Sequence, residues 1–596
     1  MTEQLEKRYA QGAKLRLKIL FALAGIFWAV LIVRLFQLQV LEAHNLRNRS
    51  DIQSFWQVTR PAPRGTIYDR RGVKLSFNLP GYSFFAVPDS VSNPRVVASR
   101  FSNMFRKPYA PIYESLNSKR DFVWLKRGLD QSQAQEIQSW KLKGVFWQEE
   151  PKRANSAGDL AQVLLGLTDV DNRGISGLEL YYESDLAGKD GKSILQKDAL
   201  GRTYDLSSKG ERKIEPGNNL VLTIDSQLQW ILENRIKEGV AETGSKSGFG
   251  ILMDPNNGEI LALAILFGEN ASDQDRGRIK PVTDQYEPGS TMKLFTAAAA
   301  LETRVKSPGD LLYAENGSWN LEVGKHVLHD IHPYQELTFQ EAFAYSSNIA
   351  VAKVGLELGA EKLYKYLRNF GFGFKTGIDL PAEAEGVIQP YDKWTRLNLI
   401  SNSIGYGISA TPLQMLCGYA AVANGGTLYK PYLVKAIIDE KGNLLKENRP
   451  SPVRSVIKPE TAEILKDFLI SVVEEGTGTL AKVEGVELAG KTGTARKINQ
   501  GSKGYQKEYL SSFIGFFPVS APRYAGIIIL DSPQGKHYGG ETAAPVFREV
   551  VKDILSLPSV PTHKLLDEKS IATYGTAGVQ AVAVKIQKEV GEKRID

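Results

Sequence analysis

The most informative segment of the sequence is Glu287-Pro288-Gly289-Ser290-Thr291-Met292-Lys293, followed by Leu294-Phe295-Thr296 and four alanines. Its Pro-Gly pair predicts a tight turn, and the apolar residues that follow predict a helix buried at the centre of a domain. Ser290 is therefore expected at or near the start of this helix, with Lys293 one turn later on the same face. A serine acyl-transfer site that uses lysine as its base requires at least a hydroxyl beside an amine at a helix N-terminus.

Ser-x-x-Lys alone is a weak signal. The same spacing occurs at Ser455-Val456-Ile457-Lys458, which has no Pro-Gly turn before it and no buried helix pattern after it. Two motifs further along support Ser290. The first is Ser346-Ser347-Asn348, which precedes an apolar helix pattern. Its motif serine, Ser346, can also be interpreted as a helix N-cap without a catalytic role. The second is Lys491-Thr492-Gly493-Thr494-Ala495.

The second of these motifs also fits a nucleotide-binding pattern. Residues 485–492 read G-x-x-x-x-G-K-T, but a phosphate-binding loop must lead from its Lys-Thr into a helix. Here Gly493-Thr494-Ala495-Arg496 predicts a strand, so we interpret the motif as a strand and not as a phosphate cradle. Another Lys-Thr-Gly, at residues 375–377, lies in a glycine-rich loop and has no following Thr-Ala.

Length and composition bound the class of protein. A chain of 596 residues predicts two or three domains, and 42% hydrophobic with 24% charged residues is typical of a folded protein. The net charge of +7 comes without an aromatic-interleaved basic patch, so an anionic cell envelope is a better expected partner than nucleic acid. The single cysteine, Cys417, excludes a disulfide within the chain.

The N-terminus carries a membrane signal. Residues 1–18 are basic, residues 19–33 are uncharged, and the apolar pattern resumes after Arg34 up to Val40. We expect a transmembrane helix at 19–40, since Arg34 can extend its charge towards the interface. A cleaved signal peptide is the first alternative, but no small-residue cleavage site follows the apolar segment. A buried helix of a soluble protein is the second, and it does not explain the basic residues before the segment. That flank predicts a cytoplasmic N-terminus, with the rest of the chain outside the cytoplasm.

The remaining chain divides into three segments. Residues 41–210 are mixed α/β in pattern, with a hairpin predicted around Asp69-Arg70-Arg71-Gly72. After a charged linker at 210–213, residues 211–556 hold the motifs, and residues 557–596 remain unassigned. A hairpin at 249–264 before Ser290, and a strand pair at 511–519 and 524–530 near the end, predict one sheet joined from both ends of this segment and covered by helices.

The three motifs in this order resemble the penicillin-binding proteins and serine β-lactamases. The stretches Gly405 to Met415 and Tyr538-Gly539-Gly540 resemble the transpeptidase domain of that family. Residues 64–72, and residues 165–179 with Leu-Gly-x-Thr-Asp-x-Asp, resemble the N-terminal module of class B, monofunctional penicillin-binding proteins, and the stretch at 165–179 is most similar to the division-type, FtsI-like member. The resemblance implies an α/β fold: a membrane anchor, a mixed α/β dimerisation or pedestal module, and a β-lactamase-like transpeptidase domain.

The resemblance also implies roles for individual residues. Ser290 would attack the penultimate D-Ala carbonyl of a D-Ala-D-Ala stem peptide, with Lys293 as its base. Ser346 would relay the proton and Asn348 would hold the substrate amide. The substrate carboxylate would lie on Lys491, Thr492, Gly493 and Thr494, and the N–H groups of Ser290 and Thr494 would form the oxyanion hole. An amine on a neighbouring strand would complete the cross-link, and β-lactams would acylate Ser290.

The family implies further partners in the inner membrane, namely a glycan polymerase and other division proteins. His326, His329 and His332 recur every third residue and raise the question of zinc. Asp330 and the proline after His332 indicate a polar loop instead, so neither a metal nor a cofactor is expected.

The rival interpretations are five. A β-lactamase needs an added glutamate, which the Trp394 to Asn398 stretch lacks, and a bifunctional polymerase needs a glycosyltransferase signature that the sequence does not contain. An elongation-type transpeptidase and a non-catalytic sensor or scaffold remain as alternatives. A cleaved secreted form is disfavoured by the N-terminal pattern.

Overall fold

The computed structural model describes residues 2–43, 55–120, 122–156, 158, 160–197, 203–205, 213–269, 271, 277–321, 326–498 and 504–557. Contacts divide the chain into two units. Unit 1 comprises Met1–Ala62 and Lys189–Glu215, and unit 2 comprises Pro63–Gly188 and Pro216–Asp596. The unassigned tail beyond Leu557 and the linker at 210–212 lie outside the described residues.

Unit 1 contains the N-terminal helix. This helix, α1 (Thr2–Phe36), continues as a π-helical turn, η1 (Gln37–Leu41). An 18-residue window within its Gly12–Leu41 part has a mean hydropathy of 2.5, and among the described residues it is the one helix long and apolar enough to cross a membrane. This is consistent with a single-pass anchor. The same unit holds an antiparallel sheet, β1 (Phe55–Arg60), β6 (Gly191–Lys197) and β7 (Thr203–Asp205).

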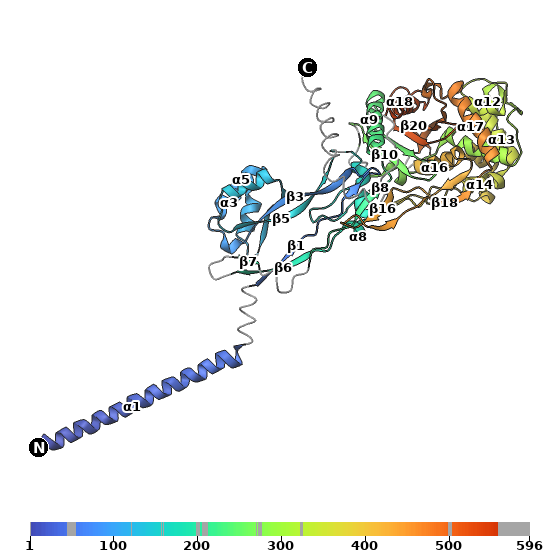
Figure 1. The fold of residues 1–596 in the computed structure, drawn as a ribbon. Coiled ribbons are helices and arrows are strands. Elements are labelled where there is room, and N and C mark those ends of the chain that lie inside the picture. The colour runs from blue at the N-terminus through green and yellow to red at the C-terminus, as the bar shows by residue number, and fades with distance from the viewer. Residues whose placement is uncertain are drawn as a thin grey trace. The chain divides into compact units, whose positions relative to one another are not determined.

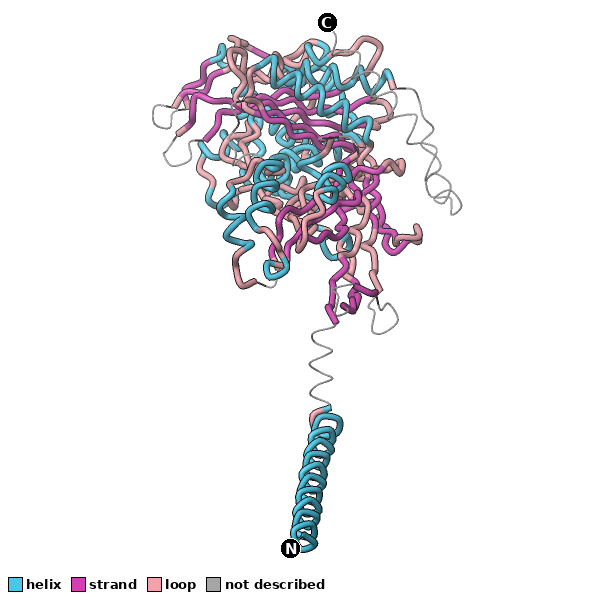
Figure 2. The backbone as a smooth tube through the Cα atoms, turned by 90° about the vertical axis from the view of Figure 1, so that its left-hand side faces the viewer, coloured by secondary structure: helices cyan, strands magenta, loops and turns pink. Residues whose placement is uncertain are grey.

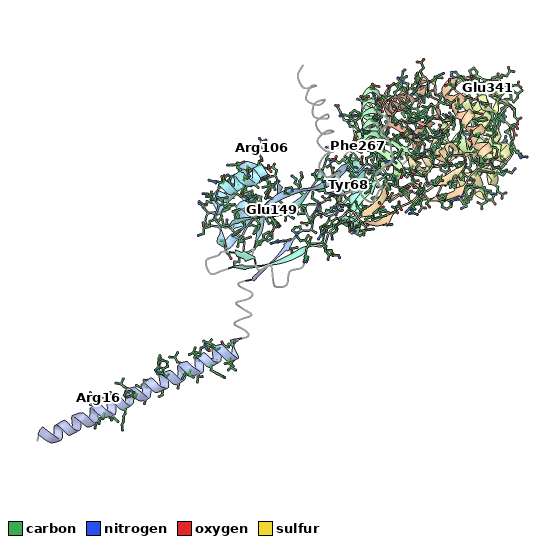
Figure 3. All side chains as sticks on the ribbon, viewed as in Figure 1. Arg16, Tyr68, Arg106, Glu149, Phe267 and Glu341 are labelled. Atoms are coloured by element: carbon green, nitrogen blue, oxygen red, sulfur yellow. The ribbon has the colours of Figure 1, made fainter. Side chains whose placement is uncertain are left out.

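The first part of unit 2 is an α/β lobe, which Figure 3 shows around the labelled Arg106 and Glu149. Its strands are β2 (Ile67–Tyr68), β3 (Lys74–Ala86), β4 (Val123–Leu129) and β5 (Val145–Asn155). Its helices are α3 (Pro94–Phe105), α4 (Tyr109–Leu116) and α5 (Gln131–Ser139), which pack on the sheet through Phe84, Phe101 and Leu125. The predicted hairpin is confirmed, because β2 pairs antiparallel with β3.

A buried ion pair connects the two class B stretches of this lobe. The Arg64 guanidinium bonds the Glu179 carboxylate, and both side chains are 1% exposed. Glu179 lies in α7 (Gly177–Tyr181), between α6 (Gln162–Leu165) and α8 (Glu183–Leu186). Arg153 of β5 also pairs with Glu179, at 2.7 Å. Residues far apart in sequence are therefore joined by charges that have no access to water.

A five-stranded antiparallel sheet forms the centre of the second part of unit 2. Its order is β10-β9-β21-β20-β19, from strands β9 (Ser247–Met253), β10 (Ile260–Phe267), β19 (Ala489–Ile498), β20 (Tyr505–Phe517) and β21 (Tyr524–Asp531). The hairpin of β9 and β10 comes before Ser290 in the chain, and it joins the strands from the end of the segment because β9 pairs with β21. The prediction of one sheet joined from both ends of the segment is confirmed.

Helices cover both faces of this sheet, as Figures 1 and 2 show. On one face, α9 (Ser226–Thr243) and α18 (Ala543–Ser556) pack together with the strands, and Asp225 caps α9. The other face carries α11 (Lys293–Glu302), α16 (Pro412–Ala423) and α17 (Pro459–Glu474). Because α11 is buried from Lys293 to Leu301, it is the central helix that the sequence predicts.

Other helices and turns of this part include α10 (Lys280–Thr283), η3 (Gly289–Met292), α12 (Phe339–Ala344), α13 (Asn348–Leu358), α14 (Ala360–Asn369) and α15 (Arg396–Ser403). Two-stranded antiparallel sheets belong to the same part: β11 (Leu311–Tyr313) with β14 (Glu336–Thr338), β12 (Ser318–Asn320) with β13 (Val327–His329), and β15 (Thr427–Tyr429) with β18 (Pro452–Ser455). A second sheet extends the lobe's strands through β8 (Asn219–Leu222), β16 (Val434–Ile438) and β17 (Leu444–Glu447).

Candidate active site

The Ser290 hydroxyl lies in a tight turn before the central helix. Gly289 to Met292 form a 3-10 turn, and the α-helix itself begins at Lys293. Ser290 is half-buried, whereas every residue from Lys293 to Leu301 is buried. Gly289 has φ +56°, a left-handed conformation that glycine adopts without the steric cost that a Cβ brings. The Pro-Gly turn thus presents the serine at the surface of an otherwise buried element.

The turn is held by its neighbours. The Gly289 N–H donates to the Gly405 carbonyl oxygen at 3.0 Å, and the buried Tyr419 hydroxyl donates to the Thr291 carbonyl oxygen at 2.8 Å. Glu287 is 7% exposed and accepts the Gly407 N–H at 2.7 Å. The stretch Gly405 to Met415 therefore fixes the nucleophile turn from behind.

Lys293 is the group best placed to act as a base. Its side chain is 0% exposed. Its Nζ donates to the Ser346 carbonyl oxygen at 2.6 Å, to Ser346 Oγ at 3.1 Å and to Asn348 Oδ1 at 2.8 Å. Burial lowers the pKa of Lys293 to about 7, against the opposing charge of Asp330. A substantial fraction of the amine is therefore neutral near pH 7.

The Ser-x-Asn motif lies in a strained turn between α12 and α13. Ser346 has φ +61°, which is uncommon for a residue with a side chain. The helix N-cap is its neighbour Ser347, whose Oγ accepts the Ala350 N–H at 3.0 Å. The alternative that the motif serine is an N-cap thus applies to Ser347, and the Ser346 hydroxyl is directed at Lys293.

The third motif lies on the edge strand β19. An edge strand leaves one row of N–H and C=O groups unpaired within the sheet, as a strand must to receive a substrate backbone or an oxyanion. The strand lies close to the nucleophile turn. A Cβ added to Gly493 would lie 2.9 Å from Thr291 Cγ2 of that turn, and it would also overlap Ser512 Oγ of the neighbouring strand β20. Thr492 Oγ1 lies 2.7 Å from Thr477 Oγ1, and Thr494 Oγ1 accepts the Gly539 N–H at 3.0 Å.

Lys491 is a second buried lysine whose amine interacts electrostatically with that of Lys293. Its side chain is 0% exposed, and its Nζ lies 5.8 Å from the centre of the Phe343 ring. Burial, and then the charge of Lys293, hold the pKa of Lys491 well below its ordinary value. The arriving carboxylate of a substrate would favour the protonated form of Lys491, because an opposite charge stabilises the ammonium.

The structure brings the predicted residues of all three motifs together around Ser290. It does not give the Ser290 hydroxyl a hydrogen bond among the described residues; Lys293 is engaged by Ser346 and Asn348 instead. Sequence reasoning missed one contributor, Asp330, whose carboxylate accepts the Asn348 N–H at 2.5 Å. The only signal for it was its place in the polar loop between two histidines, which identifies no partner.

Comparisons with known proteins indicate which family the chain belongs to. Residues 248–552 match the penicillin binding protein transpeptidase domain, and residues 59–222 match the penicillin-binding protein dimerisation domain. The chain is 34% identical over 533 residues to stage V sporulation protein D of Bacillus subtilis, covering 87% of this chain and 82% of that protein. It is 29% identical over 579 residues to the peptidoglycan D,D-transpeptidase FtsI of Escherichia coli, covering 94% and 95%.

A solved structure agrees as well. Penicillin binding protein 3 of Mycobacterium tuberculosis, complexed with aztreonam, superposes with a TM-score of 0.64 at 28% identity, over 84% of this chain and 96% of that one. The transpeptidase match spans half of the chain, and the identity to the sporulation protein extends over most of both proteins. The chain therefore belongs to the class B penicillin-binding proteins, the serine-type peptidoglycan D,D-transpeptidases.

Proposed function

We propose that this protein cross-links peptidoglycan at the division septum by acyl transfer through Ser290. The observation that carries the chemistry is the Lys293 amine, buried next to Ser346 and Asn348 with a pKa lowered to about 7. A base of this pKa can accept the Ser290 proton at neutral pH. Lys293 lies one helical turn from Ser290, which puts the two side chains on the same face.

The remaining residues act on the donor peptide. Ser290 Oγ bonds to the penultimate D-Ala carbonyl carbon, and its proton passes to Lys293. The N–H groups of Ser290 and Thr494 stabilise the oxyanion, Asn348 holds the peptide amide, and Lys491 with Thr492, Gly493 and Thr494 holds the terminal carboxylate. Ser346 passes the proton to the leaving D-Ala amine as its bond to the carbonyl breaks. An amine of a neighbouring strand then attacks the acyl-enzyme and releases Ser290.

We also propose how the chain is divided into domains. Residues 19–40 anchor the chain in the inner membrane with residues 1–18 in the cytoplasm, residues 41–210 form the pedestal module, and residues 211–556 form the extracytoplasmic transpeptidase domain. The basic flank of the anchor supports this orientation. A membrane-embedded glycan polymerase and other division proteins are the proposed partners.

The septal role rests on the division-type stretch at 165–179 and on the similarity to FtsI. Similarity to a sporulation protein leaves other growth modes, including elongation, as the alternative. A fluorescent fusion separates them: a band at midcell with filamentation on depletion supports septal synthesis, whereas signal along the side wall with loss of rod shape supports elongation.

Fluorescent penicillin tests the chemistry. Membranes with the wild-type protein should show a stable labelled band that Ser290→Ala abolishes. A label lost within seconds indicates hydrolysis and thus a β-lactamase, and an unlabelled wild type contradicts catalysis and favours the sensor or scaffold.

A further inference from the structure

The N-terminus of α13 is closed by a side chain from a separate segment. Asp330 follows strand β13, and its Oδ1 accepts the N–H groups of Asn348 at 2.5 Å and of Ile349 at 3.1 Å. Its Oδ2 accepts the Ser347 hydroxyl at 2.5 Å. The first N–H groups of a helix have no partner within the helix and carry partial positive charge. One carboxylate therefore fixes three consecutive residues at the start of α13.

These bonds determine how Asn348 is oriented. Its backbone N–H is held by Asp330, and its side-chain Nδ2 donates to the His329 carbonyl oxygen at 2.9 Å. The remaining amide atom, Oδ1, accepts from Lys293 Nζ at 2.8 Å. The segment His329–Asp330 thus holds both ends of Asn348 while its amide oxygen faces the lysine.

Ser346 needs the same support. A residue with a side chain that is held in the left-handed region is strained, and it persists only where the surroundings determine it. On one side of the turn, the Ser346 N–H donates to the Phe343 carbonyl oxygen at 3.1 Å, and the Ser347 N–H donates to the Ala342 carbonyl oxygen at 2.9 Å. On the other side, Asp330 supplies the bonds that prevent the turn from relaxing into α13.

We propose that Asp330 is a positioning residue that acts through residues 347–349, directing the hydroxyl and carbonyl of Ser346 and the amide of Asn348 at the Lys293 ammonium group. This inference rests on the proposed function, because it gives Asp330 a part in the acylation of Ser290. It adds a fourth segment to the three sequence motifs that build the site.

The charge of Asp330 has a second, separable effect. Among the described residues, the charged groups whose fields act on one another here are Lys293 of α11, Lys491 of β19 and Asp330. Tyr334 also faces Asp330 and is neutral at pH 7. Asp330 raises the pKa of Lys293 while burial lowers it. Without that negative charge, burial acts unopposed and the pKa of Lys293 falls below about 7.

Two variants separate position from charge. In Asp330→Asn, the amide oxygen can still accept the two backbone N–H groups, and the amide nitrogen can donate to the Ser347 hydroxyl, so the geometry is kept and only the charge is lost. In Asp330→Ala, both the bonds and the charge are lost. Asp225→Ala is the matched control, since Asp225 also accepts N–H groups at a helix N-terminus, that of α9, which lies outside the site.

The experiment measures the second-order rate constant of acylation by fluorescent penicillin from pH 5 to pH 9, on the full chain in detergent. We expect Asp330→Ala to lower this constant on the order of 10²-fold, since misplaced catalytic groups cost about that much. Asp330→Asn should lose less, but the midpoint of its acid limb should lie at lower pH than that of the wild type. Asp225→Ala should match the wild type in rate and midpoint.

The outcomes are distinct. If Asp330→Ala, shown to be folded by its thermal unfolding transition, is acylated at the wild-type rate, the positioning role is wrong. If Asp330→Asn loses rate without moving the acid limb, the electrostatic effect is wrong and Asp330 is only a structural cap. In both cases the wild type is labelled at Ser290, so the proposed function stands. A wild type that is not labelled overturns the proposed function and this inference together.

Discussion

Lys293 Nζ donates to the carbonyl oxygen of Ser346 at 2.6 Å, across 53 residues of chain. The backbone carbonyl of Ser346 is not a proton carrier, so this bond only orients the Lys293 amine. Proton transfer can involve the hydroxyl of Ser346, which Lys293 Nζ also contacts. The bond to the carbonyl oxygen also ties the central helix α11 to the strained turn before α13. The nucleophile motif and the Ser-x-Asn motif are therefore held in fixed positions relative to each other by this hydrogen bond.

The pKa of Lys293 predicts the acid limb of the reaction. Since the base must be neutral and its pKa is about 7, the acylation rate constant should rise about tenfold per pH unit below 7 and level off above it. Stopped-flow acylation by fluorescent penicillin checks this. Lys293→Arg, which stays charged, should be inactive at every pH. A profile that is flat from pH 5 to pH 8 would contradict the assignment of Lys293 as base.

The second lysine predicts an alkaline limb. Lys491 has to be protonated to hold a carboxylate, and its pKa lies well below the ordinary value of a lysine. Acylation should therefore decline at a pH well below 10.5, with apparent values that belong to the coupled lysine pair. The methyl ester of the same penicillin has no carboxylate to bind, so it should show little of this decline. Equal profiles for acid and ester would argue against Lys491 as the carboxylate site.

The contact between β19 and the nucleophile turn predicts the effect of a single methyl group. In Gly493→Ala, the added Cβ would overlap Ser512 Oγ and press on Thr291, which should destabilise the fold by about 1–3 kcal/mol and slow acylation. Gly309→Ala is the control, since a Cβ there has nothing within 4 Å. Thermal unfolding and penicillin labelling measure the two effects. Normal labelling of Gly493→Ala would mean that β19 can shift away without cost.

The conformation of Ser346 predicts opposite effects on stability and activity. Ser346→Gly relieves the left-handed strain, whereas Ser346→Ala retains it, so the glycine variant should be the more stable by about 1 kcal/mol. Both lack the hydroxyl, and both should acylate about 10²- to 10⁴-fold more slowly if Ser346 transfers the proton. Paired melting curves and rate constants provide the comparison. A fully active Ser346→Gly protein would remove Ser346 from the proton path.

The Arg64–Glu179 pair predicts a large loss of stability far from the catalytic motifs. Removing one partner of a buried pair leaves an uncompensated charge and costs about 3–5 kcal/mol, so Arg64→Ala should strongly destabilise the lobe. Arg449→Ala, which breaks a pair whose arginine is 82% exposed, should cost about 0–1 kcal/mol. Limited proteolysis locates the loss; equal resistance of the two variants would count against a stabilising role for Arg64.

Much of this site could be predicted because its signals are local. The Pro-Gly turn, the apolar run after Ser290 and the strand-like continuation after Gly493 each need only neighbouring residues to be interpreted, and all three appear in the structure. The hairpins at either end of the transpeptidase segment are local too, and alternate apolar strands with turn residues.

What could not be predicted depends on contacts between distant segments. Ser346 and Ser347 are adjacent serines before one helix, and only the folded backbone shows that the second is the cap. Asp330 has no sequence pattern that links it to α13. The tightening of the nucleophile turn into a 3-10 turn also depends on tertiary bonds, from Gly405 and Tyr419.

The pairing of β9 with β21 has a consequence for how the protein is made. These strands lie at residues 247–253 and 524–531, so the central sheet cannot close until nearly the whole domain has been synthesised. Pairings of such long sequence separation form slowly, because loop closure precedes any gain in contacts. A nascent chain therefore carries its serine and lysine long before it carries the strand that would bind a substrate carboxylate, and the complete site can form only after that strand has been synthesised.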